Sequence, residues 1–180
     1  MPSNGIRYVY CDIYASNCTH GPGDYIINGT YQNAWNTAFS NWTGHKTNNN
    51  SGIGFYEASD NSIPYYTIEI LRVTNISIPN AVATMQANMW PTDSSGDNVT
   101  DTCRVRSARI DIKSSVNGGI FGIWVMAHEI GHTMGLADCY LCGMYTTVMT
   151  SETFVLNSTD TSIPQTPTTC DNQQVAAVGF

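Results

Sequence analysis

The stretch Ala127–Cys139 reads AHEIGHTMGLADC. Its two histidines, His128 and His132, stand four residues apart, so on a helix both imidazoles leave the same face, one turn apart, and can reach a single metal ion. Glu129 follows the first histidine and can act on a water at the ion without being a ligand itself. Nitrogen and carboxylate donors suit Zn²⁺, which in catalytic sites takes three protein ligands and keeps a fourth position for water. The stretch therefore predicts a helix that carries a catalytic zinc site, with Glu129 as the general base.

Gly135 and Asp138 extend this pattern at fixed spacing. A glycine three residues after His132 can adopt the positive φ that ends a helix sharply and turns the chain back. The turn brings Asp138 to the metal as a third ligand from outside the helix. The resulting pattern, HExxHxxGxxD, resembles the metzincin clan of zinc endopeptidases, whose signature is HExxHxxGxxH. With aspartate in the last position, it is similar to the snapalysin family of small secreted bacterial metzincins.

Two further segments resemble the same family. Residues 135–140 read GLADCY, close to the snapalysin-like GLPDxY, and Thr147–Thr150 is similar to the clan's Met-turn, in which Met149 would lie beneath the metal as an apolar floor. The resemblance implies that the Tyr140 phenol donates a hydrogen bond to the tetrahedral oxyanion. The alternative is that Tyr140 is a loop aromatic packed beside the disulfides. The motif-level match covers about residues 127–150.

Hydrophobic periodicity predicts the elements around the motif. We expect strands at residues 7–13, 65–70, 81–90 and 104–113 and helices at residues 30–42, 120–134 and 171–178. The resemblance implies an α+β, metzincin-like fold, with a twisted mixed β-sheet, an active-site helix and a C-terminal helix. It places a cleft between an upper subdomain of about residues 1–135 and a small lower one of about residues 136–180. It also implies that the strand before the active-site helix is the sheet edge on which an extended substrate lies. That rim would be Ala108, Arg109, Ile110 and Asp111.

Composition fits one secreted domain. At 180 residues the chain can bury about 70% of its unfolded surface in one core, and it has no apolar run long enough to span a membrane. Its net charge of -7 and pI of about 4.7 argue against nucleic acid or an anionic membrane as partner. A strand pattern already begins at Arg7, so we expect a mature domain whose export signal and prosegment have been removed. We expect a monomer that acts on protein or peptide substrates.

The chain has six cysteines, an even number that indicates disulfides in an oxidising compartment. We expect a local Cys11–Cys18 pair. The resemblance implies Cys142–Cys170 below the site, and Cys103–Cys139 then follows by elimination. The spacing of Cys139 and Cys142 also fits a redox or metal pair, but their place in a loop directly after Asp138 favours structural disulfides.

The turn Asp93–Asp101 is dense in oxygen donors. It lacks the spacing of an EF-hand, so it is either a Ca²⁺ site of another kind or a solvated loop.

Two other functions remain open. Glu152 lies twenty residues after His132, a spacing that resembles the third ligand of thermolysin-like gluzincins, although Val148–Met149 fits a Met-turn better. The chain can also be a secreted binding module that keeps a structural zinc ion without catalysis. The intact Glu129 argues against that second alternative.

Overall fold

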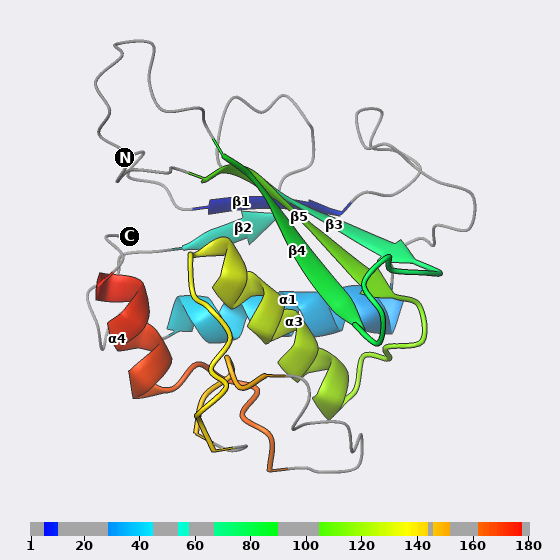
Figure 1. Ribbon diagram of the computed structural model, residues 1–180. Helices are drawn as coiled ribbons and strands as arrows, with labels where there is room; N and C mark the ends of the chain where they lie inside the picture. Colours follow the sequence, from blue (N-terminus) through cyan, green and yellow to red (C-terminus); the bar gives the residue numbers. More distant parts are fainter. Residues whose placement is uncertain are drawn as a thin grey trace.

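The computed structural model describes residues 6–10, 29–44, 54–57, 67–89, 105–143, 146–151 and 162–177. Within them the elements follow in the order β1 (Ile6–Tyr10), α1 (Gly29–Gly44), β2 (Phe55–Glu57), β3 (Thr67–Val73), β4 (Ala83–Met89), β5 (Val105–Lys113), α3 (Ile120–Thr133) and α4 (Thr169–Ala177) (Figure 1). The three predicted helices begin and end within two residues of α1, α3 and α4. The four predicted strands overlap β1, β3, β4 and β5, whereas β2 was not predicted because three residues are too short to show an alternating pattern.

The five strands form one mixed sheet in the order β2-β1-β3-β5-β4. β2, β1, β3 and β5 run parallel, and β4 is antiparallel to β5. β3 and β5 alternate in burial: Ile68, Ile70, Ala108, Ile110 and Ile112 are buried in the main core. The sheet therefore directs one apolar face towards the helices.

The prediction that Ala108–Asp111 forms a sheet edge is wrong. These residues lie in β5, which pairs with β3 on one side and β4 on the other; Ala108, for example, stands opposite Ile68 of β3 and Ala87 of β4. The alternation of polar and apolar residues along β5 reflects the two faces of the sheet, and both edge and interior strands can have two unlike faces. Among the strands of the described residues, the outer one at this end of the sheet is β4.

α1 and α3 lie together under one face of the sheet (Figure 1). The apolar face of α1 consists of Trp35, Phe39 and Trp42, spaced i, i+4 and i+7, and all three are buried. The Trp42 indole Nε1 donates a hydrogen bond of 2.9 Å to the carbonyl oxygen of Ala127 in α3. This bond joins α1 to the turn of α3 that carries the histidine motif.

Gly122, in the first turn of α3, should not tolerate a side chain. A Cβ at this position would overlap the carbonyl oxygen of Asn117, a backbone atom that cannot rotate away. We expect Gly122→Ala to lower the free energy of unfolding by about 3 kcal/mol, at the upper end of the usual cost of overpacking. Urea denaturation of Gly122→Ala and of a control, Gly143→Ala, measures this difference. A Cβ on Gly143 would make only an ordinary 3.5 Å contact with Thr146, so equal stability of the two variants would contradict the prediction.

Candidate metal centre

α3 ends in a turn built by Gly135. The N–H of Gly135 donates to the His132 carbonyl oxygen at 2.9 Å, and the N–H of Leu136 donates to the Gly131 carbonyl oxygen at 3.2 Å. These two bonds form a Schellman motif, and Gly135 has the positive φ, 84°, that the motif favours. The predicted turn is confirmed. It directs the following residues, including Asp138, back towards the helix.

His128, His132 and Asp138 meet at one point. The two Nε2 atoms are 3.1 Å apart, and the Asp138 Oδ1 atom lies 3.0 Å from Nε2 of His128 and 3.5 Å from Nε2 of His132. Ligand atoms around a tetrahedral zinc ion are separated by about 3.4 Å, given Zn–N and Zn–O distances of about 2.1 Å. The three observed separations bracket this value, so the residues fit a zinc ion.

Hydrogen bonds to the other ring nitrogens fix which atoms of the two imidazoles face Asp138. Nδ1 of His128 lies 2.8 Å from the Val148 carbonyl oxygen, and Nδ1 of His132 lies 2.8 Å from the Leu136 carbonyl oxygen. Because a carbonyl can only accept, both Nδ1 atoms carry the proton, and in the neutral imidazoles both Nε2 atoms present a lone pair. Two lone pairs and a carboxylate oxygen then converge, an arrangement that a cation stabilises. Backbone carbonyls have no side-chain signature, so sequence reasoning could not identify these two partners.

The protein groups around the site also shift one another's pKa values. Burial lowers the pKa of His128, but the hydrogen bonds to Asp138 and to the Val148 carbonyl, together with the charges of Glu129 and Asp138, outweigh burial and raise it overall. The pKa of His132 is lowered, first by burial and then by the charge of His128. The hydrogen bond from His128 lowers the pKa of Asp138. A proton on His128 is therefore the competitor of a metal ion at this site.

Glu129 is buried, with 3% of its surface exposed, directly beside the histidines. One of its carboxylate oxygens lies within 4.8 Å of a ring nitrogen of each histidine. Asp138 Oδ1 lies closer, 3.0 and 3.5 Å from the two Nε2 atoms, so both carboxylates stand beside the histidines.

Met149 packs directly against the motif helix. A Cβ on Gly131, between the two histidines, would overlap the Met149 sulfur, so the glycine makes room for this side chain. The N–H of Cys139 donates to the Met149 carbonyl oxygen at 2.7 Å, and Cys139 pairs with Thr150 in an isolated parallel bridge. The segment that carries Asp138 is thus held to the segment that carries Met149, and both lie against α3.

Tyr140 contacts the ligand carboxylate. Its hydroxyl donates to Asp138 Oδ2 at 3.3 Å, and the residue is 65% exposed. The charge of Asp138 raises the pKa of the phenol, which favours its protonated form. A side chain this exposed is not packed in the core. Because the hydroxyl contacts Asp138, orienting that carboxylate is a third possible role, beside the oxyanion donor and the packed loop aromatic.

The disulfide pairing differs from the prediction. Cys139 and Cys142 form a disulfide with a Cα–Cα distance of 5.3 Å, and Cys170 is an exposed free thiol. The predicted pairs Cys142–Cys170 and Cys103–Cys139 are therefore wrong. The turn after Asp138 brings Cys139 and Cys142 within the range that a disulfide spans, so the pair closes locally. Cys11, Cys18 and Cys103 lie outside the described residues.

Two other predicted sites also lie outside the described residues. They are the oxygen-rich turn 93–101, considered for Ca²⁺, and Glu152, considered as an alternative third ligand.

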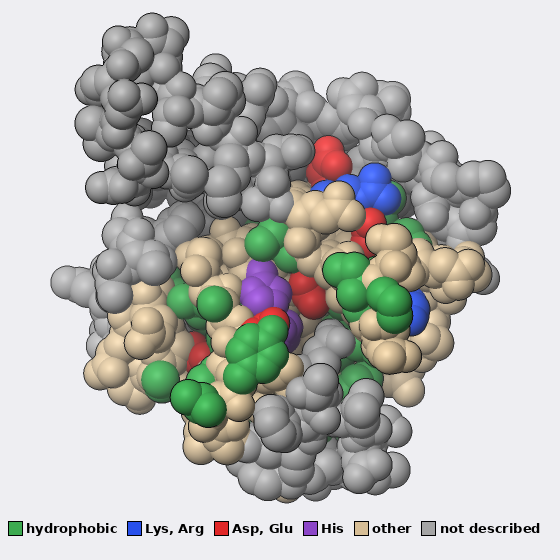
Figure 2. All heavy atoms as spheres, in the orientation of Figure 1, with side chains coloured by type: hydrophobic (Ala, Val, Ile, Leu, Met, Phe, Trp, Pro, Cys, Tyr) green, Lys and Arg blue, Asp and Glu red, His purple; other side chains and the backbone are tan. Residues whose placement is uncertain are grey.

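The site reaches the surface of the molecule. Figure 2 shows histidine side chains in the middle of one face, with acidic side chains next to them and hydrophobic ones close by. The side chain of His128 is 3% exposed, whereas those of His132 and Asp138 are 19% and 31% exposed. A ligand can therefore approach the site from the side of His132 and Asp138.

Comparison of the chain with protein-family models found no match, and neither did a search of curated proteins. In the described part of the chain, no helix is both long and apolar enough to cross a bilayer.

Proposed function

We propose that this protein is a secreted zinc endopeptidase of the metzincin type, similar to the snapalysins. The observation that carries the proposal is the convergence of His128, His132 and Asp138 at ligand spacing, with a buried glutamate beside them. The small mixed sheet over the motif helix, with α4 near the chain end, agrees with the α+β fold that the resemblance implies.

Each residue has a defined task in peptide hydrolysis. Zinc supplies a Lewis acid that polarises the scissile carbonyl and lowers the pKa of water. His128, His132 and Asp138 would hold the ion and leave one side open for substrate. Glu129 takes a proton from the attacking water and passes it to the leaving amine, which is general acid–base catalysis by one carboxylate.

The substrate binds along β4 in this proposal, which replaces the rim expected on β5. Among the described strands, β4 pairs only with β5, so its other edge can accept an extended peptide as an added strand. β4 also contacts α3, the helix that carries the histidines. A peptide on this edge would therefore extend a strand that packs against the helix of the histidine motif.

Metal removal tests the proposal. Dialysis against a chelator should abolish cleavage of casein, and one equivalent of Zn²⁺ should restore it, because the ligand set supplies no other route to activate water. Ca²⁺ alone should not restore cleavage. Cleavage by a metal-free sample would contradict the proposal. A protein that binds one zinc ion tightly but cleaves neither casein nor a peptide library would instead be the binding module.

A further inference from the structure

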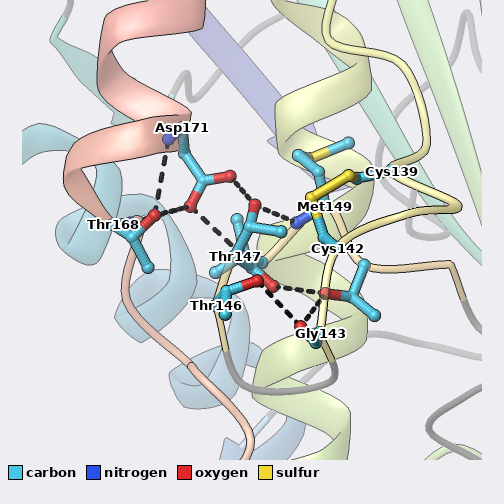
Figure 3. Close-up of a disulfide and its surroundings, with 10 residues drawn as sticks. Cys139, Cys142, Gly143, Thr146, Thr147, Met149, Thr168 and Asp171 are labelled. Carbon is cyan, nitrogen blue, oxygen red and sulfur yellow. Dashed lines mark hydrogen bonds between the residues drawn. A yellow bond between two sulfur atoms is a disulfide. The ribbon is translucent and has the colours of Figure 1, made fainter.

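A chain of hydrogen bonds runs from the ligand His128 to a buried carboxylate on α4. Nδ1 of His128 donates to the Val148 carbonyl oxygen at 2.8 Å. The N–H of the same peptide group, on Met149, donates to Thr147 Oγ1 at 3.0 Å. The Thr147 hydroxyl in turn donates to Asp171 Oδ1. Figure 3 shows the second half of this chain, with Asp171 pointing from α4 towards Thr147.

Asp171 is firmly held at the end of this chain. It is 2% exposed, and its second oxygen, Oδ2, accepts the N–H groups of Val148 and Thr168 at 3.2 and 2.7 Å and the Thr168 hydroxyl at 2.8 Å. The N–H of Asp171 donates back to Thr168 Oγ1 at 3.4 Å, which makes a capping box at the start of α4. The carboxylate therefore cannot rotate away from Thr147 without breaking the start of the helix.

All donors in this series of hydrogen bonds point the same way, from His128 towards the Asp171 carboxylate. Hydrogen bonds in series polarise one another, so an acidic group at one end strengthens the acceptor at the other. A histidine ligand whose Nδ1–H is held by a carbonyl or carboxylate is fixed in orientation and is more basic at Nε2, and losing such a partner usually costs ten- to a hundredfold in metal affinity. Here the peptide group between Val148 and Met149, together with Thr147, lies between the imidazole and the carboxylate.

We propose that Thr147 and Asp171 are positioning residues for the metal centre, acting on His128 through the peptide group between Val148 and Met149. This inference rests on the metal centre of the proposed function and not on peptidase activity. It assigns to α4 a role in holding a ligand that lies in α3, more than forty residues earlier in the chain.

Zinc affinity of matched variants, measured by competition with a chromogenic chelator, tests the inference. Thr147→Val keeps the shape of the side chain but removes the hydroxyl that links the Met149 N–H to Asp171. We therefore expect a zinc affinity about ten- to a hundredfold lower. Thr147→Ser restores the hydroxyl and should restore the affinity. The control is Thr150→Val: Thr150 is also buried in this segment, but its hydroxyl donates to the carbonyl oxygens of Gly143 and Thr147, which are not links in the chain. Its zinc affinity should stay near that of the wild type.

An equal loss of affinity in Thr147→Val and Thr150→Val would overturn the inference, because it would indicate only a loss of packing. If Thr147→Val does not fold, NMR of the imidazole groups of the zinc-loaded wild type decides: His128 should carry its proton on Nδ1 and exchange it slowly, and rapid exchange would overturn the inference. A wild type that binds zinc but cleaves no peptide would refute the proposed function and leave these affinity results valid.

Discussion

Glu129→Gln should keep zinc and fold as the wild type does, while kcat on a peptide substrate falls by about two to four orders of magnitude. The amide has the same shape as the carboxylate, so the buried position next to His128 can accommodate it. It cannot take up a proton, however, so the step that activates water loses its base. Metal content, circular dichroism and kcat measured on the same preparation check all three statements.

The result separates the two tasks that a carboxylate can have here. Loss of zinc together with activity would mean that Glu129 is a ligand, since its oxygen lies within 4.8 Å of a ring nitrogen of each histidine. Unchanged activity with zinc retained would mean that another group is the base. Glu57→Gln, on an exposed residue of β2, is a suitable control for the loss of one negative charge.

Asp138→Ala should lower zinc affinity more than about a hundredfold, beyond the usual loss for a residue that only supports a ligand. The reason is that Asp138 Oδ1 completes the group of three ligand atoms, and two histidines alone leave the ion with too few protein ligands. Chelator competition on the purified variants measures the effect. Glu152→Ala should bind zinc like the wild type, and a zinc-free Glu152→Ala beside a zinc-loaded Asp138→Ala would overturn the metzincin assignment in favour of the gluzincin one.

Tyr140→Phe tests the contact with Asp138 without changing the carboxylate. It removes only the phenol hydroxyl, which donates to Oδ2 of Asp138. We expect it to retain zinc and to lose about tenfold in kcat if the phenol donates to the oxyanion in the transition state. A lower zinc affinity would show instead that the hydroxyl orients Asp138. Unchanged affinity and kcat would remove both roles.

The convergence of His128, His132 and Asp138 could be predicted from sequence because the three residues are close together in the chain. His128 and His132 share a helix face by spacing alone. Gly135 ends that helix in a turn, and the turn brings Asp138 Oδ1 to 3.5 Å from Nε2 of His132. Likewise, the buried face of α1 follows from the recurrence of Trp35, Phe39 and Trp42. Periodicity and turn chemistry determine such features, since both act over a few neighbouring residues.

Tertiary structure alone decided the features that depend on distant parts of the chain. The pattern of β5 shows that its two faces differ, but only its pairing with both β3 and β4 shows that it is not an edge. The resemblance implied Cys142–Cys170, yet the fold brings Cys142 to Cys139. The bond from His128 to the Val148 carbonyl, and the path onward to Asp171, use backbone groups that are the same in every residue. Strand order and backbone hydrogen bonds are set by how the whole chain packs, so no local pattern in the sequence could determine them.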